Sequence, residues 1–451
     1  MNPSQYVVFI TLCILLLIGI VSPVAAQENA PVPVAYAETD AGVKLYAVSA
    51  DKILETVGTL PDDFNTDGHD KKWMIRHSFV VSPDEQQLAF TAQKSGDNEA
   101  YVGLFIYSLV THTIRQVIDE IYVGYFFHLK WSPDSQNLLI EPEVEDNCGC
   151  MGRPEVRVYN LVSDTLIQLT DQSRNVYGRV FTWAENNRDL VYAGNGVNIV
   201  EFGLGGIHRQ PLVNFEINPP PDSFSGSCNF AWSEQRARWY YVVGCLWLID
   251  DPLDSLYSVD LSGHARLEAN IPDLLRQEFP LPPGNNPYVE DVSVTSIHAT
   301  ADTVYAALSF KATVATGSSD TDSDVEDKAF WRVMSIDAQG QIETAFEFTE
   351  WNIFTSSLIQ AAFAPDNQKV VLVDREHIVV GDLATGKQLV SLTRTLENWY
   401  QRMDVLWINA HELLYLADDD VWLLDTSDGT TVNLTTDIEA VAFLLPQTNS
   451  Y

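Results

Sequence analysis

The chain has 451 residues, of which 46% are hydrophobic and 20% are charged, a composition typical of a globular protein and not of a disordered one. Its 62 acidic and 26 basic residues give a formal net charge of −36. Such a surface repels phosphate backbones and anionic lipid, so the composition argues against a nucleic-acid partner.

The N-terminal segment is uncharged and contains an apolar run from Val7 to Val21. This run is shorter than the roughly 20 residues that cross a bilayer. Val24 and Ala26 stand at positions −3 and −1 before Gln27, as in a signal-peptidase site. We therefore predict a signal peptide over 1–26 and a secreted or periplasmic protein. The alternative is an uncleaved N-terminal segment that anchors the chain in a membrane.

Three short apolar runs follow, at 32–37, 43–49 and 53–59, with turn-forming residues between them. Runs of this length predict antiparallel strands. They lack the opening strand that the later repeats of the chain have, so the sequence predicts an incomplete unit at this end.

The next segment, 63–70, reads DFNTDGHD and predicts a calcium loop. Oxygen ligands at alternate positions curl around a cation, and a glycine permits the sharp turn. The candidate metal ligands are Asp63, Asn65, Asp67 and Asp70. Met74 stands at position 12, where such a loop usually has a glutamate. An acidic turn without a ligand is therefore the favoured alternative, and calcium is the only cofactor that we expect.

One phrase recurs along the rest of the chain: FVVSPDEQQLAF at 79–90, LKWSPDSQNLLI at 129–140 and AAFAPDNQKVVL at 361–372. Weaker copies complete a series that can be aligned on the residue before the turn. The aligned residues are Val81, Trp131, Trp183, Trp232, Ile297, Phe363 and Trp407. Their spacing of 44 to 66 residues is typical of repeat arrays, among them propellers of four-stranded blades.

Each repeat contains four strand-like runs; the last one reads DVLWI, ELLYLA, DVWLLD and TVNLT. Four short strands per repeat make one blade. Proline cannot donate to a sheet ladder, so the Ser-Pro-Asp phrase ends the innermost strand, while serine and aspartate satisfy the turn amides. We therefore predict a scaffold role for Ser82 and Ser132, in preference to a catalytic one, and a tryptophan that wedges between neighbouring blades.

The run AVAFLLP at 440–446 has no partners within the last repeat. Pairing it with the three N-terminal runs closes the ring and removes the exposed edges. The predicted fold class is all-β: a β-propeller of four-stranded antiparallel blades that fills 27–451 as a single domain. The best count is eight blades. Seven or six stay open because the units between 270 and 360 carry long insertions.

Four cysteines follow the signal segment, and an even number in an exported chain favours disulfides. Cys228 and Cys245 fall on successive predicted strands and are the first pair that we expect. Cys148 and Cys150 enclose one glycine, so they close a tight loop or chelate a metal, although no nearby histidine supports a zinc site.

Aromatic residues recur in the connections between blades, which gather on one face of a propeller. The candidate ligand-binding residues are Trp73, Tyr122, Tyr125, Tyr177, Trp351, Trp399 and Tyr400. Aromatic rings on a rim suit the recognition of sugars or peptides. For each ring taken singly, hydrophobic capping of a blade end is the favoured alternative.

The repeats, carried by VVSPDEQQLAF, KWSPDSQNLLI and FAPDNQKVVLV, resemble the TolB-like, WD-repeat-like propellers over most of residues 30–450. The resemblance implies the propeller architecture. That family usually has a glycine after Ser-Pro-Asp, where this chain has Glu85, Ser135 and Asn367. We expect neither the N-terminal domain of TolB nor the hydrolase domain of the propeller peptidases in this sequence, so the resemblance implies neither function.

The sequence contains no G-x-S-x-G elbow and no H-E-x-x-H motif. We therefore predict an exported, non-enzymatic propeller that binds a protein, a peptide or a glycan. The alternative is a propeller hydrolase or lyase whose site lies in the central channel, because such sites leave little linear signature.

Overall fold

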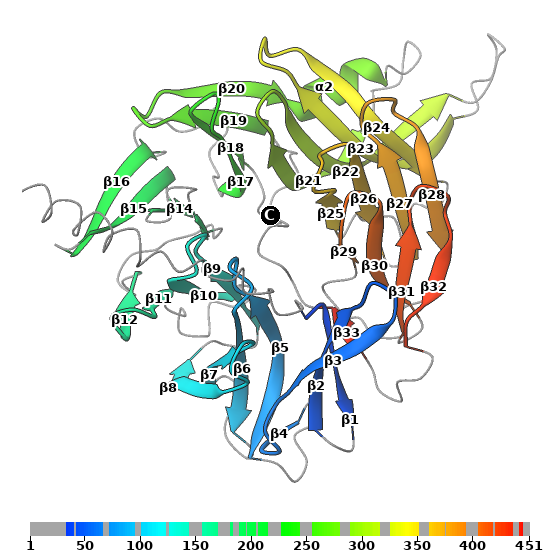
Figure 1. Cartoon of the computed structure of the whole chain (residues 1–451). Helices are drawn as coiled ribbons and strands as arrows, with labels where there is room; N and C mark the ends of the chain where they lie inside the picture. The colour runs from blue at the N-terminus through cyan, green and yellow to red at the C-terminus, as the bar shows by residue number, and fades with distance from the viewer. Residues whose placement is uncertain are drawn as a thin grey trace, which may run out of the picture.

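The computed structural model of the chain is a ring of β-sheets (Figure 1). It describes residues 33–39, 42–65, 72–94, 101–122, 126–143, 156–169, 181–183, 189–194, 196–203, 206–214, 227–243, 255–279, 289–315, 325–350, 360–374, 376–393, 405–417, 420–435 and 442–444. Among these residues no helix is both long and apolar enough to cross a membrane.

The strands of this described part form seven four-stranded antiparallel sheets and one sheet of five strands. The expected propeller of four-stranded antiparallel blades is thereby confirmed. The first two sheets in the chain are β1 (Ala35–Thr39), β2 (Gly42–Val48) and β3 (Leu54–Thr59) with β33 (Ala442–Leu444), and β4 (Phe64–Asn65), β5 (Trp73–Val81), β6 (Gln87–Lys94), β7 (Tyr101–Ser108) and β8 (Ile114–Tyr122).

The next three sheets follow in chain order. They are β9 (Phe126–Trp131), β10 (Asn137–Glu143), β11 (Arg157–Asn160) and β12 (Thr165–Gln168); β13 (Phe181–Trp183), β14 (Asp189–Gly194), β15 (Gly196–Gly203) and β16 (Gly206–Asn214); and β17 (Ser227–Ser233), β18 (Arg238–Val243), β19 (Ser255–Asp260) and β20 (Ala265–Asn270).

The last three sheets are β21 (Val289–Ala299), β22 (Val304–Ala315), β23 (Val325–Ile336) and β24 (Ile342–Glu350); β25 (Gln360–Phe363), β26 (Lys369–Val373), β27 (His377–Asp382) and β28 (Gln388–Thr393); and β29 (Val405–Trp407), β30 (Glu412–Ala417), β31 (Asp420–Asp425) and β32 (Thr431–Asn433). The predicted strands of the last repeat, from DVLWI to TVNLT, are thus found at their expected places.

The innermost strands, such as β5, β17, β21 and β25, surround the centre of the ring, and the blades that these strands open continue outward in chain order (Figure 1). Because each blade is a meander, its first and third turns lie at one end of the sheet. We call this end the turn face; its first turns are 82–86, 132–136, 234–237, 300–303, 364–368 and 408–411. The opposite end, where the chain passes from blade to blade, is the connection face.

The ring is closed by strands from the two ends of the chain. β33 pairs antiparallel with β1, with Tyr36 opposite Phe443, and the sheet order is β3-β2-β1-β33. This is the predicted pairing of the run at 440–446 with the three N-terminal runs. It gives β1 a partner on both sides, so β1 is not an exposed edge strand.

The Ser-Pro-Asp turns follow the predicted chemistry. The Ser82 hydroxyl donates to Asp84, 2.5 Å away, and accepts from the Gln87 amide at 2.9 Å. Ser132 repeats this arrangement with Asp134 and its own following amides. Both serines are buried and used within the turn, which confirms their scaffold role.

The residue after each aspartate has a left-handed backbone. Glu85, Ser135 and Asn367 have φ values of 58°, 59° and 58°. Glycine adopts this conformation without steric cost, whereas other residues are strained by about 1 kcal/mol or more. The family that the chain resembles therefore has its glycine at a position where the backbone is left-handed.

Tryptophans link neighbouring blades as predicted. The Trp131 indole donates to the carbonyl of Val80 at 3.1 Å, and Trp407 donates to Ala362 at 3.1 Å. Trp183 makes the same bond to the Lys130 carbonyl at 3.0 Å. In each case the acceptor precedes the aligned residue of the previous blade by one position. The sequence repeat therefore corresponds to a hydrogen bond that recurs between neighbouring blades.

One blade departs from the others. Strands β21 to β23 have 11 or 12 residues, and the helix α2 (Ile271–Glu278) packs against this sheet. The sequence analysis missed this helix. Asn270 caps it by accepting from the Asp273 amide, and Pro272 occupies its first turn, where a missing N–H costs nothing.

Candidate functional site

The predicted aromatic face is only partly within the described residues. Tyr122 ends β8, where its backbone pairs with Tyr101. Tyr125, Tyr177, Trp351, Trp399 and Tyr400 lie outside the described residues. Their proposed role in binding stays a prediction.

Trp73 opens β5 at the connection face, but it does not present its ring there. The side chain is only 7% exposed and belongs to the core between two blades. Its indole meets Phe105 edge-on, with ring centroids 5.0 Å apart. Trp73 therefore follows the alternative that we favoured for single rings: it caps a blade end hydrophobically, and little of it is available to a ligand.

The base of the predicted calcium loop is well defined. β4 pairs in parallel with the start of β5, and the Trp73 amide donates to the Asp63 carbonyl at 2.9 Å. The Asp63 side chain is exposed, whereas Asn65 is buried. Asp67 and Asp70 lie outside the described residues, so calcium binding stays a prediction.

The predicted disulfides are also untested. Cys228 lies in β17 opposite Val242. Cys148, Cys150 and Cys245 lie outside the described residues. The described part of the chain holds no group of three or more histidines, cysteines or carboxylates with the spacing of a metal site.

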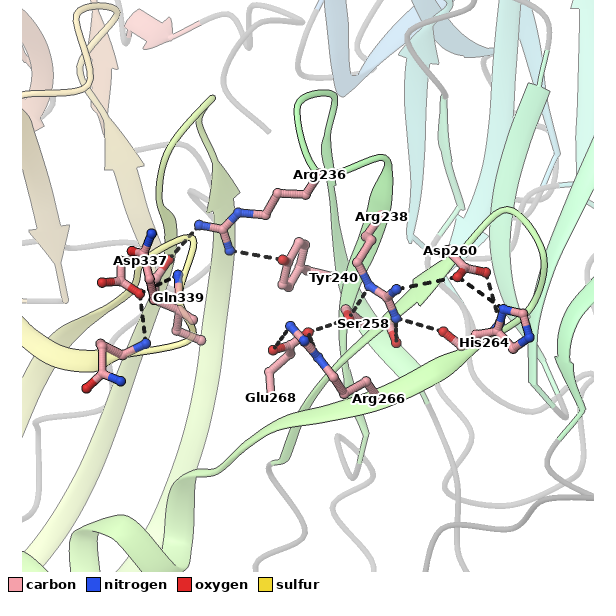
Figure 2. A network of polar contacts seen from close by, with 12 residues as sticks. Arg236, Arg238, Tyr240, Ser258, Asp260, His264, Arg266, Glu268, Asp337 and Gln339 are labelled. Atoms are coloured by element: carbon pink, nitrogen blue, oxygen red, sulfur yellow. Dashed lines mark hydrogen bonds and ion pairs between the residues drawn. The ribbon is translucent and has the colours of Figure 1, made fainter.

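The turn face carries a series of polar contacts between successive blades. Arg236 spans from the β17–β18 turn to the next blade, where it donates to the carbonyls of Asp302 at 2.6 Å and Ile336 at 3.1 Å (Figure 2). Lys369 donates to the Ala410 carbonyl of the following blade at 2.7 Å. These cations use main-chain oxygens of a neighbour, so they hold the blades together.

Further contacts of this kind continue around the turn face. The Asp84 amide donates to Ser135 at 3.0 Å. Lys52 pairs with Glu412 of the neighbouring blade at 2.6 Å. Several turn residues of the described blades are therefore already used by the fold.

Figure 2 shows a dense polar network within the β17–β20 blade, beside Arg236. The Arg238 guanidinium donates to the Ser258 hydroxyl at 2.7 Å and to the His264 carbonyl at 2.7 Å. Ser258 in turn donates to Glu268, which also holds Arg266 through two bonds of 2.9 and 2.7 Å. The two arginines are largely satisfied by the blade itself, so this network stiffens the sheet.

The same network contains a carboxylate with a shifted pKa. The pKa of Asp260 is held below its ordinary value, chiefly because the His264 amide donates to its Oδ1 at 3.0 Å. Hydrogen bonds to the ionised form favour that form. Asp260 is therefore a turn-capping anion at neutral pH.

A buried carboxylate and a histidine lie together at the connection face. Asp374 follows β26, is fully buried, and accepts from the amides of Glu376 at 2.7 Å and His377 at 2.5 Å. The His377 Nδ1 lies 3.3 Å from Asp374 Oδ1. Burial raises the pKa of Asp374. Sequence reasoning missed this pair because D-R-E-H reads as an ordinary turn.

A half-buried histidine joins two blades, and we expect it to make the fold sensitive to acid. His298 donates from Nε2 to the Asn367 amide oxygen at 2.6 Å and stacks on Phe363, with ring centroids 4.5 Å apart. Burial lowers its pKa. Because the unfolded chain then takes up a proton at a higher pH than the folded one, stability is lost as the pH falls below about 6.5.

We expect the free energy of unfolding to fall between about pH 8 and about pH 5.5, and to fall less in His298→Gln, which cannot titrate. Urea unfolding of both proteins at the two pH values measures the difference. An equal loss in the two proteins would assign the acid sensitivity to other groups.

Comparison with known proteins gives no family. No family profile matches the sequence, and no curated relative does. Many solved structures are similar to the chain at low identity, and three of them are described here. An oligogalacturonate lyase in complex with manganese is 10% identical, with a TM-score of 0.45, over 89% of this chain and 96% of that one.

The periplasmic gluconolactonase of Pseudomonas aeruginosa is 12% identical, with a TM-score of 0.41, over 79% of this chain and 96% of that one. The β-propeller domain of the trilobed protease from Pyrococcus furiosus is 13% identical, with a TM-score of 0.40, over 82% and 98%. The assignment of the fold therefore rests on the sheet topology of the chain itself.

Proposed function

We propose that this chain is an exported, non-enzymatic binding module whose connection face receives a protein, a peptide or a glycan. The contacts of the turn face support this proposal. Arg236 and Lys369 are used there between blades, whereas the aromatic residues of the sequence fall in the connections of the opposite face. Loops that a rigid scaffold positions disproportionately carry binding residues.

The kinship with TolB-like, WD-repeat-like propellers is part of the same proposal, supported by the left-handed residue after each aspartate. We infer that the five-stranded sheet is the eighth blade, since β5 to β8 repeat the common order and β4 adds only two residues.

Two matched triple variants test the binding face. Trp351→Ala, Trp399→Ala and Tyr400→Ala together should abolish capture of the partner by the immobilised chain. The control combines Val110→Ala, Val162→Ala and Leu261→Ala, three exposed apolar residues of the turn face, and should leave capture unchanged. Loss of capture in the control alone would assign the partner to the turn face and overturn the proposal.

Calcium binding by the 63–70 loop is a second proposal, supported by the closed base of that loop. A ligand that binds only the folded state raises the unfolding midpoint by mass action. We expect calcium to raise this midpoint relative to chelator, and Asp67→Asn to remove the rise. Asp62→Asn, beside the motif but outside its spacing, is the control. If calcium acts equally on both variants, the loop is not its site.

An enzymatic function remains the alternative, and the Asp374–His377 pair favours it among the described residues. A buried carboxylate beside an imidazole can orient a general base. Screening glycan, lactone and peptide substrates tests it: turnover that His377→Gln abolishes would support catalysis, and no turnover would favour the binding module.

A further inference from the structure

Five of the innermost strands share a polar level above the turn face. We count from the residue that faces the first residue of the second strand across the first turn, which is Ser233 for β17, Ala299 for β21 and Ala364 for β25. The fifth residues, counted away from the turn, are Asn229, Thr295 and Gln360. In β5 and β9 the fifth residues are Ser78 and His128. These five residues are polar, whereas Phe443 of β33, which pairs with Tyr36, stands at this level in the closing blade.

At this level the ladder of two neighbouring blades is interrupted. In β17 the register shifts between Cys228 and Phe230, which leaves Asn229 as the extra residue. In β21 it shifts between Val294 and Ser296, which leaves Thr295. Each extra residue follows four regular pairs from the turn. Both bulges therefore lie at the same level of the inner wall. Bulges re-aim side chains and are over-represented next to functional sites.

The two bulges are joined to each other, and one of them has a left-handed backbone. The Asn229 Nδ2 donates to the Val294 carbonyl on β21 at 2.9 Å. Asn229 also has a left-handed backbone, with φ of 53°. Strained conformations of this kind persist where the surrounding structure fixes them, and they cluster at ligand sites.

Two oxygens at this level are buried and have no hydrogen-bond partner in the described part of the chain. They are Oγ1 of Thr295 and Oε1 of Gln360, on adjacent innermost strands. Ser293, two residues before Thr295, is exposed although β21 is an innermost strand. A buried polar atom without a partner is costly, and a ligand that supplies the partner recovers that cost.

We propose that the inner wall formed by β17, β21 and β25 is a binding site for a neutral, hydroxyl-rich ligand, that is, a saccharide. Asn229, Thr295 and Gln360 carry amide and hydroxyl groups at this level, and such groups exchange hydrogen bonds with sugar hydroxyls without a charge to neutralise. The site rests on the proposed binding function and narrows it to the glycan class.

The test uses two nearly isosteric variants, Thr295→Val and Gln360→Leu, and one matched control, Ser233→Ala. Ser233 Oγ is also buried without a partner, but it lies beside the turn, away from the polar level. Maltotriose, cellotriose and chitotriose, each at about 10 mM, are the probes, and the unfolding midpoint of the full chain is measured with and without each.

We expect at least one saccharide to raise the midpoint of the wild type and of Ser233→Ala, and each site variant to weaken its binding about tenfold or more. Without saccharide, both site variants should unfold at a higher temperature than the wild type, because an unpartnered polar group has been replaced by an apolar one.

Two results would overturn the site. A saccharide shift that both variants retain would move the glycan elsewhere on the chain and leave the proposed function standing. A lower midpoint of the unliganded variants would show that the two oxygens already have partners. Absence of any saccharide shift would overturn the ligand class, while partner capture by the connection face would still test the proposed function separately.

Discussion

Gly381→Ala is expected to destabilise the protein by about 3 kcal/mol, although alanine is the better residue for a strand interior. Gly381 lies in β27, and a Cβ atom there would stand 2.5 Å from Cγ and Cδ2 of Phe346. Phe346 belongs to β24 of the preceding blade and is fully buried. Neither group can move without disturbing two blades, because protein interiors are close-packed.

A double-mutant cycle separates this steric clash from a general effect on β27. Phe346→Leu should cost stability alone but recover part of the loss in Gly381→Ala, since residues in contact are not additive. Gly58→Ala is the strand-glycine control with a milder clash, because the nearest atom to its Cβ would be the hydroxyl of Tyr107 at 2.9 Å. Urea unfolding measures all four variants. Equal losses in Gly381→Ala and Gly58→Ala would contradict the clash.

The repeat made much of the fold predictable. The Ser-Pro-Asp phrase marks the first turn of a blade because proline and the two polar side chains act locally. The tryptophan before it acts between blades, but at a constant position, so the sequence period carries this contact too. The closing strand β33 was predictable because an unpaired apolar run needs a sheet.

Features without a period were missed. α2 has only eight residues and follows a strand directly, too short a segment for helical periodicity to be distinguished from a strand. The bulges at Asn229 and Thr295 are insertions of a single residue, and they become visible only when the ladder of the neighbouring strand is known. The polar fifth position was present in the sequence, but the alignment was wrong by one residue in β21. His298, and not Ile297, is equivalent to Trp232, because His298 pairs with Tyr305 seven residues later.

The candidate site was less predictable for a related reason. An aromatic residue at a blade connection serves packing or binding equally well, and Trp73 packs because β4 and Phe105 cover it. Burial is a tertiary property, and no local pattern in the sequence reports it. The buried pair Asp374 and His377 became visible for the same reason only in three dimensions.

Arg332→Met is expected to cost about 3 kcal/mol and to loosen α2. Arg332 lies on β23 and is 2% exposed. Its guanidinium donates to Glu278 of α2 at 2.5 and 2.8 Å and to Glu347 of β24 at 2.6 Å. The rings of Phe279 and Phe310 lie 5.7 and 5.2 Å from it. Methionine keeps the packing against the rings and removes the charge.

The expected loss lies at the lower end of the range for a broken buried ion pair. The two carboxylates remain partly in water, since the side chains of Glu278 and Glu347 are 49% and 30% exposed. Arg332→Lys should give an intermediate loss, because an ammonium keeps the charge but cannot hold a carboxylate through two parallel bonds.

Arg276→Met provides the matched control on the same helix. Arg276 pairs with Asp273 at 3.1 Å, but both side chains are well exposed, at 38% and 55%, so this pair should contribute only about 0.5 kcal/mol or less. Urea unfolding gives the total loss, and hydrogen exchange of the α2 amides shows whether the helix opens first. If Arg332→Met and Arg276→Met lose the same stability, Arg332 is not what fixes α2 on its blade. The apolar contacts of Ile271 and Leu275 would then hold the helix alone.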